Sequence, residues 1–259
     1  MIDFHNHILP NVDDGPKTIE ESISMLKYAS IKGITEVVQT VHFQHPKMDS
    51  KNVDYKFLRN EVEKLERQLF KHNIKIKIHL TAEVFYLPNL TKLVNNKLTT
   101  LSNKFILVEF SSSIFPRNYE EEFYKIQNMN FTPIIAHPER YRFVQNDLSI
   151  INDWVSKDFI IQLDAGSLIG HFGKKVQDIS WRIVDKYGFH LLGSDAHNNR
   201  KRNFCLPEAY NMIDKKYNSD IVLELKNNAS LILKGDFPLL VKNKHNNSLY
   251  DIIKSKFRY

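Results

Sequence analysis

The chain has 259 residues, of which 25% are charged and 42% belong to the hydrophobic class. This length suits one α/β domain with a large core, and the composition excludes wholesale disorder. The single cysteine, Cys205, excludes an internal disulfide and favours a reducing compartment. No Cys-x5-Arg loop surrounds it, so we expect an ordinary thiol there.

The net charge of +6 is concentrated at the C-terminus. The tail combines apolar residues with one acid and five bases: Asp251 against Lys242, Lys244, Lys254, Lys256 and Arg258. Two interpretations stay open for it, docking on an acidic partner or membrane surface, and a solvated extension or short terminal helix. Elsewhere we find no basic stripe with interleaved aromatic residues, so we expect no nucleic-acid binding.

The N-terminus lacks a basic segment followed by an apolar one, so we expect no signal peptide. No apolar run approaches the roughly 20 residues of a membrane-spanning helix. We therefore expect a cytoplasmic protein that does not span a membrane, and leave its oligomeric state open.

Apolar runs of strand length alternate with helical patterns along the chain. We expect strands near 2–8, 34–41, 76–80, 105–108, 132–136, 159–163 and 189–193. We expect helices over 18–31, 50–72, 119–129, 147–157 and 176–187, and helical material over 206–226. The first helix has Thr18 and Glu21 at capping-box spacing.

This alternation predicts an α/β fold, with a seven-stranded parallel sheet and right-handed crossovers. At this length a closed or nearly closed TIM-like (β/α)7 barrel is favoured over an open sheet. We expect one domain over 1–238, followed by a basic tail over 239–259.

The opening stretch contains His5 and His7, two residues apart on a predicted strand. Such residues project to the same face, where two imidazoles can bind one cation. The pattern alone is weak evidence, because a strand end with two half-exposed histidines is equally ordinary. A metal site therefore requires further ligand residues at the ends of other strands.

Further ligand-type residues stand at or near the ends of the other predicted strands. Together with the opening pair, the set is His5, His7, Asp14, His42, Glu83, Glu109, His137, Asp195 and His197. In barrels the C-terminal strand ends carry the chemistry, so these residues should converge. We predict a multinuclear metal site.

Glu109 strengthens this prediction because it follows the apolar run 105–108 and precedes Phe110. Burying an unpaired carboxylate costs several kcal/mol, which a bound cation offsets. The competing interpretation is a salt bridge to a helix lysine or to Arg140.

The predicted ligands are carboxylates and imidazoles without a thiolate. This donor set suits Mn²⁺, Fe or Zn²⁺ better than Ca²⁺, with Mg²⁺ as a further option, and the number of ligands fits three ions. Arg140, Arg200 and Arg202 lie close in sequence to ligands, and guanidinium groups beside a metal suit phosphate oxygens. The residues predict metal-assisted phosphoester hydrolysis.

Seven segments together resemble the polymerase-and-histidinol-phosphatase (PHP) superfamily. They are His5-Asn-His7, Val12-Asp-Asp-Gly-Pro16, Thr40-Val-His42, Ala82-Glu83, Val108-Glu-Phe110, Ala136-His-Pro-Glu-Arg-Tyr141 and Gly193-Ser-Asp-Ala-His197. Within it, the chain is most similar to the bacterial manganese-dependent protein-tyrosine phosphatases of capsule and exopolysaccharide operons. The match covers about residues 1–235.

The resemblance implies a distorted seven-stranded barrel with three Mn²⁺ ions. One ion would be bound by His5, His7, Glu83 and Asp195, the second by Glu83, Glu109 and His137, and the third by Asp14, His42 and His197. Arg140 and Arg202 would bind phosphate, and a metal-activated hydroxide would attack phosphorus without a phosphocysteine. The leaving-group acid is left open between water and His42.

The implied substrate is the phosphotyrosine-bearing tail of a bacterial tyrosine autokinase that controls polysaccharide chain length. One departure is Asp164, at a strand end where the family usually has small polar residues. It is interpreted as an extra ligand, an acceptor for a ligand histidine, or a turn-initiating residue.

Three alternatives remain open. The first is a small-molecule PHP phosphatase such as histidinol phosphatase. The second is an amidohydrolase or metal-dependent DNase barrel, which usually lacks the Asp-Asp-Gly and the final Asp-x-His pair. The third is a metal-bound scaffold that binds a kinase without turnover.

Overall fold

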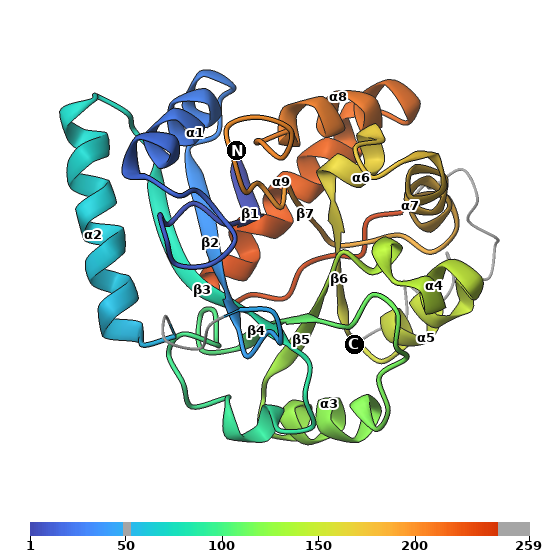
Figure 1. Ribbon diagram of the computed structural model, residues 1–259. Helices are drawn as coiled ribbons and strands as arrows, with labels where there is room; N and C mark the ends of the chain where they lie inside the picture. Colours follow the sequence, from blue (N-terminus) through green and yellow to red (C-terminus); the bar gives the residue numbers. More distant parts are fainter. Residues whose placement is uncertain (49–52, 243–259) are drawn as a thin grey trace.

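Seven strands form one parallel sheet in the order β1-β2-β3-β4-β5-β6-β7 (Figure 1). The computed structural model describes residues 1–48 and 53–242. The strands are β1 (Ile2–Asn6), β2 (Glu36–Phe43), β3 (Lys77–Phe85), β4 (Phe105–Glu109), β5 (Thr132–Ala136), β6 (Ile160–Asp164) and β7 (Leu191–Gly193). The predicted seven-stranded barrel with helical crossovers is confirmed.

Backbone hydrogen bonds join the first strand to the segment after the last strand at the C-terminal end of the barrel. The His7 N–H donates to the Ala196 carbonyl at 2.8 Å, and the Asp195 N–H donates to the His5 carbonyl at 2.8 Å. An isolated parallel bridge joins Asn6 to Ala196. These contacts, just beyond β7, close the ring at the edge where the predicted ligands stand.

Helices surround the barrel, with α1 and α2 beside β1 to β3 and α3 near β4 and β5 (Figure 1). The longer helices are α1 (Ile19–Ile31), α2 (Tyr55–Lys71), α3 (Tyr119–Asn128), α5 (Ser149–Ser156), α7 (Lys174–Lys186), α8 (Leu206–Lys216) and α9 (Ser219–Lys234). Shorter turns are η2 (Leu90–Lys92), η3 (Pro138–Arg140), α4 (Arg142–Asn146) and α6 (Ala165–Ile169).

The helical material expected over 206–226 is confirmed and consists of two helices, α8 and α9. The side chain of Asn218 accepts from the Ile221 N–H at 3.1 Å and starts α9 separately from α8. The predicted cap of α1 is confirmed, since the Thr18 hydroxyl accepts from the Glu21 N–H at 3.2 Å.

Alternate residues of the strands fill the interior of the barrel, as expected for a period of two. The inner cluster includes Ile2, Phe4, Val38, Phe105, Leu107, Ile134, Ala136, Ile160 and Leu191. Ala229 and Ile232 of α9 belong to the same cluster, so this helix packs against the interior. The interior at the N-terminal end of the barrel is therefore a packed apolar core. Polar side chains further along the strands face the opening at the C-terminal end.

Strands β2 and β3 extend beyond their predicted ends. Their pairing continues without interruption from Glu36↔Lys77 to Phe43↔Val84. His42 and Glu83 therefore lie opposite each other within strands, not after them. Pairing with a neighbour in the barrel extends both strands past the apolar runs that the sequence displays.

The predicted domain boundary at residue 238 stays a prediction. Val241 and Phe189 form an antiparallel bridge, so the chain still packs on the domain three residues later. Most of the basic tail, residues 243–259, lies outside the described residues. Among the residues described, no helix is long and apolar enough to cross a membrane. The cytoplasmic location stays a prediction.

Candidate functional site

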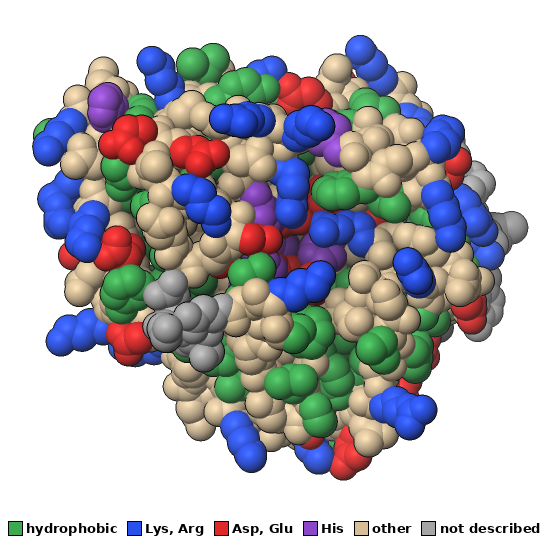
Figure 2. Space-filling view, in the orientation of Figure 1, with side chains coloured by type: hydrophobic (Ala, Val, Ile, Leu, Met, Phe, Trp, Pro, Cys, Tyr) green, Lys and Arg blue, Asp and Glu red, His purple; other side chains and the backbone are tan. Residues whose placement is uncertain are grey.

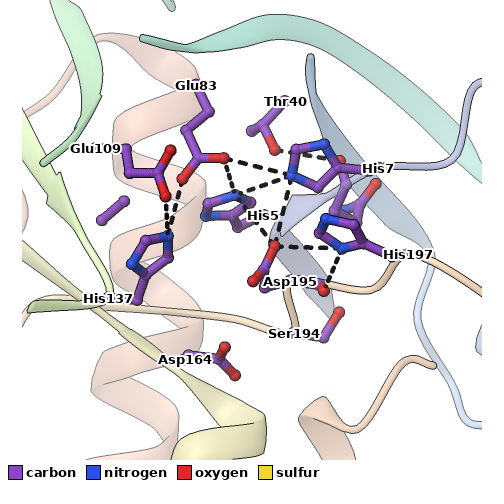
Figure 3. A network of polar contacts seen from close by, with 12 residues as sticks. His5, His7, Thr40, Glu83, Glu109, His137, Asp164, Ser194, Asp195 and His197 are labelled. Atoms are coloured by element: carbon purple, nitrogen blue, oxygen red, sulfur yellow. Dashed lines mark hydrogen bonds and ion pairs between the residues drawn. The ribbon is translucent and has the colours of Figure 1, made fainter. Parts of the chain in front are cut away.

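The structure brings all nine predicted ligand residues together at the C-terminal end of the barrel. Figure 3 shows His5, His7, Glu83, Glu109, His137, Asp195 and His197 around one common space. They come from β1, β3, β4 and the segments that follow β1, β5 and β7. Asp14 and His42 complete the set through their contacts with these residues.

His5 and His7 reach the site through an irregularity in β1. The β1–β2 register shifts between Asp3 and Asn6, so the regular alternation is interrupted after Phe4. Phe4 belongs to the inner apolar cluster, yet the Nε2 atoms of His5 and His7 lie only 3.3 Å apart. Bulges of this kind often redirect side chains beside functional sites.

A first group of ligand atoms joins these two histidines to Glu83. Glu83 Oε2 lies 3.1 Å from Nε2 of His5 and 3.4 Å from Nε2 of His7. Asp195 Oδ1 lies 3.6 Å and 3.5 Å from the same nitrogens. The four residues assigned to one ion by the family resemblance therefore face one another.

A second group lies toward the surface and is centred on Asp14. Its Oδ1 is 3.1 Å from His197 Nε2 and 3.4 Å from His42 Nε2. His7, His42, His197 and Asp14 bring their ligand atoms within 4.8 Å of one another. The predicted set for this ion is together, with His7 added.

A third group contains His42, Glu83 and Glu109. The resemblance implies His137 here in place of His42. His137 Nε2 lies 2.9 Å from Glu83 Oε1 and 3.9 Å from Glu109 Oε1, so it borders the same space. The assignment of individual ligands to individual ions stays a prediction.

Several buried polar atoms of this cluster have no hydrogen-bond partner within the protein. They include Oε2 of Glu109 and Nδ1 of His42. Leaving such atoms without a partner is costly, and divalent cations satisfy carboxylate and imidazole donors together. The residues present therefore fit a metal centre.

Burial and neighbouring charges shift the pKa values of the residues in this cluster. Burial and the neighbouring Glu83 raise the pKa of Glu109 well above its ordinary value. Burial, followed by Arg140, lowers the pKa of His137 to about 4, so its imidazole is neutral. Burial alone would raise the pKa of Glu83, yet His5 and His137 hold it well below its usual range. A cation would relieve the repulsion between the two glutamates.

Three of the histidines are oriented by hydrogen bonds through Nδ1. His7 Nδ1 lies 2.9 Å from Asp13 Oδ2, and His5 Nδ1 lies 3.2 Å from Gln162 Oε1. His197 Nδ1 lies 2.8 Å from the Asp195 carbonyl. Each contact fixes a tautomer with the proton on Nδ1 and leaves Nε2 free to bind a metal.

Two site residues have backbone conformations that could not be predicted from the sequence. His137 has φ of 32° and Asp195 has φ of 48°. Non-glycine residues with positive φ are uncommon and gather at functional sites. Here they turn the chain directly after β5 and β7, so that each side chain faces the cluster.

The two predicted phosphate-binding arginines share one carboxylate oxygen. Arg140 donates to Asp195 Oδ2 at 2.5 Å, and Arg202 donates to the same atom at 2.7 Å. Asp195 Oδ1 faces the histidines, so this residue connects the arginines with the metal ligands. Arg200 is exposed, and its backbone N–H donates to Asn198 Oδ1 at 3.0 Å in the loop.

No role for Asp13, Gln162 or His45 could be predicted from the sequence. Asp13 stands beside the predicted ligand Asp14, but its contact with His7 depends on the folded loop. Gln162 lies on β6 opposite the bulged strand. The His45 ring is tilted by 38° against the His42 ring with centroids 4.8 Å apart, and its Nε2 lies 3.8 Å from Glu109 Oε2. A polar residue inside the apolar run 159–163 was the available signal for Gln162.

The site opens to solvent through a cavity of about 170 Å³. Its lining combines acids and histidines with basic residues, among them Lys47, Arg140 and Arg202. Figure 2 shows histidine and acidic side chains at the bottom of a hollow with lysines and arginines around it. A cationic rim above a metal-ligand cluster suits an anionic substrate.

Comparisons with known proteins agree with this geometry. The family model described as capsular polysaccharide synthesis, CpsB/CapC, matches residues 1–234. The chain belongs to the CpsB/CapC family. Among its relatives, the tyrosine-protein phosphatase YwqE of Bacillus subtilis is 35% identical over 237 residues, which cover 91% of this chain and 92% of YwqE.

Another CpsB/CapC relative, the tyrosine-protein phosphatase CpsB of Streptococcus pneumoniae, is 30% identical over 87% of this chain and 94% of its own. A crystal structure from work on YwqE and the pneumococcal CpsB, described as unique metal-dependent tyrosine phosphatases, matches with a TM-score of 0.85. It is 32% identical and covers 93% of this chain and 100% of that one. The predicted family is confirmed.

A more distant likeness shows the fold alone. Histidinol phosphate phosphatase from Lactococcus lactis matches with a TM-score of 0.53 at 16% identity, over 83% of this chain and 92% of its own. The CpsB/CapC barrel thus shares its architecture with that enzyme.

Proposed function

We propose that this protein is a metal-dependent tyrosine-protein phosphatase that removes phosphate from phosphotyrosine in a protein of capsular or exopolysaccharide synthesis. The observation that carries the proposal is the convergence of nine ligand-type side chains beside two arginines at the open end of the barrel. Its CpsB/CapC relatives carry the same activity in their names.

The ions, when bound, supply an activated water for attack on phosphorus and neutralise charge on the phosphate. The protein provides their ligands, which are His5, His7, Asp14, His42, Glu83, Glu109, His137, Asp195 and His197. Among divalent metals we propose Mn²⁺, with Fe, Zn²⁺ and Mg²⁺ as alternatives that the same donors accept.

Arg140 and Arg202 bind the phosphate oxygens. Both are anchored on Asp195 at one guanidinium nitrogen, and the cavity borders both side chains, so further N–H groups are available for substrate. Planar guanidinium groups provide bidentate donors for phosphate. The proton for the leaving phenolate oxygen is assigned either to His42, which lines the cavity, or to water.

A cysteine nucleophile is not part of this mechanism. Cys205 is buried at 5% exposure, and burial raises the pKa of its thiol. Protonated, inaccessible thiols do not attack phosphorus.

The proposed substrate partner is the phosphotyrosine-bearing tail of a bacterial tyrosine autokinase. The cationic rim suits a segment with several negative charges, and phosphotyrosine contributes about two each. We propose no nucleic-acid partner.

The decisive experiment measures phosphate release by the full chain from a phosphotyrosine peptide, with added Mn²⁺ and with excess chelator. We expect turnover with Mn²⁺ and its loss with chelator. Histidinol phosphate is assayed in parallel, and a higher kcat/KM on that compound would replace the proposal with a small-molecule phosphatase. Peptide binding without any phosphate release would contradict an enzymatic role and indicate a scaffold.

A further inference from the structure

Asp164 ends β6 and is completely buried beside the candidate site. Its Oδ1 accepts from the Gly166 N–H at 2.6 Å and from the Ser167 N–H at 3.3 Å, so it caps α6. Its Oδ2 accepts from Arg140 at 3.2 Å. The two carboxylate oxygens therefore have different partners: Oδ1 accepts from backbone N–H groups of α6, and Oδ2 accepts from the arginine.

The position of Asp164 is itself fixed by a buried neighbour. Its backbone N–H donates to Glu139 Oε1 at 3.0 Å, and Glu139 has no exposed surface. Burial raises the pKa of Asp164 to about 8, while the charged guanidinium of Arg140, which donates to Oδ2, opposes this rise and favours the carboxylate.

Arg140 is held on three sides. Besides Asp164, it donates to Asp195 Oδ2, and its guanidinium lies 4.6 Å from the centre of the Phe172 ring. The side chain keeps 24% of its surface exposed, toward the cavity that it lines. A long, flexible side chain held in this way loses its rotamer freedom before a ligand arrives.

We propose that Asp164 is a positioning residue, which acts through Arg140 to hold its guanidinium in the orientation that binds the substrate phosphate. This inference deepens the proposed function and rests on it for the identity of the phosphate ester. Asp164 is absent from the three groups of close ligand atoms among the described residues. Its contacts instead connect β6, α6 and Arg140 into one rigid support.

The test compares Asp164→Asn and Asp164→Ser with the unmodified protein. Both replacements retain an acceptor for the N-terminus of α6, because Asn and Ser are good capping residues. Neither retains an anionic oxygen for Arg140. A matched control is Asp54→Asn, because Asp54 caps α2 by accepting from the Phe57 N–H at 2.7 Å and lies on a helix away from the cavity.

Two measurements report on Arg140 separately from folding. The first is the Kd of inorganic phosphate for the metal-loaded protein by calorimetry, and the second is KM and kcat on a phosphotyrosine peptide. We expect both Asp164 variants to weaken phosphate binding about tenfold, with bound metal and Tm retained. In an Arg140→Ala background the same replacements should change the phosphate Kd by less than about twofold.

Four results would overturn the inference. One is an unchanged phosphate Kd, and another is an equal loss of affinity in the Arg140→Ala background. A loss of bound metal would make Asp164 a ligand, and a lower Tm with normal phosphate affinity would make it only a helix cap. The Kd of phosphate can be measured without turnover. If the unmodified protein did not hydrolyse the peptide, the proposed function would be contradicted, but the role of Asp164 could still be tested by phosphate binding.

Discussion

Asp13 orients His7 from the side opposite the candidate metal centre. Its Oδ2 lies 2.9 Å from Nδ1 of the imidazole, and the Nε2 atom of His7 lies 3.4 Å from Glu83 Oε2. The same Oδ2 accepts from the backbone N–H of His42 at 3.3 Å, so one buried oxygen connects two predicted ligands. Carboxylates behind ligand histidines commonly fix the tautomer and increase the affinity for the metal.

Asp13→Asn should therefore lower metal affinity about 10- to 100-fold. The amide keeps an oxygen for the Gly15 N–H, which Oδ1 accepts at 3.0 Å, but it removes the charge that faces His7. Metal titration monitored by calorimetry measures the effect, with Asp54→Asn as the control. An unchanged affinity would show that Asp13 serves only the loop.

Glu109→Ala and His137→Ala should each reduce Mn²⁺-dependent hydrolysis of p-nitrophenyl phosphate about a hundredfold or more. Each replacement removes one metal ligand from the side of the cluster where Glu83, Glu109 and His137 face one another. Glu83 cannot replace the lost ligand, because it already contacts other ligand residues. The matched control is Glu121→Ala on the exposed face of α3. Unmodified turnover in either site variant would contradict the proposed ligands.

Gly193 is required by the close approach of β1. A Cβ atom at this position would lie 2.4 Å from Cβ of His5 and 2.4 Å from Nε2 of Gln162. Gly193→Ala should lower the free energy of unfolding by about 3 kcal/mol, because the two strands must separate. At Gly235 a Cβ atom would meet no atom closer than 3.8 Å, so Gly235→Ala should cost about 1 kcal/mol through its φ of +85° alone. Urea unfolding compares the two, and equal losses would contradict the packing argument.

His190 should make the protein less stable in acid. Burial lowers its pKa from 6.5 to about 3, and its Nδ1 accepts from the Ile161 N–H at 3.0 Å. Above about pH 6.5 the residue is neutral in both states, and between about 6.5 and 3 the unfolded chain binds a proton that the folded protein refuses. Its contribution therefore falls as the pH falls through this window, by about 1.4 kcal/mol per pH unit.

The corresponding measurement is the difference in unfolding free energy between the unmodified protein and His190→Asn at several pH values from 4.5 to 7.5. The amide oxygen of Asn can still accept from the Ile161 N–H, while the titrating group is gone. The pH slope should be smaller in the variant. Equal slopes would assign the acid sensitivity to other groups.

The barrel and the convergence of the ligands could be predicted from the sequence because parallel strands share one direction. Glu109 and His137 follow apolar runs, so their place at the C-terminal edge depends only on strand polarity. What could not be predicted depends on tertiary contacts. His42 lies inside β2 because pairing with β3 lengthens the strand. Both arginines meet on Asp195, which has a positive φ that the sequence does not indicate.

Helix α6 was also missed, since its five residues carry no periodic pattern and its start depends on the side chain of Asp164. The contact of Gln162 with His5 links residues 157 positions apart, and only the closed ring brings them together.

The closure of the ring determines which part of the structure should open first when the metal is lost. The backbone bonds that join His5 and His7 to Asp195 and Ala196 are the ones that align ligands from the two ends of the chain. An ion held by His5, His7 and Asp195 would cross-link the first strand to the last. Loss of metal should therefore loosen this joint before the apolar interior beneath it, and local opening would begin at the catalytic edge.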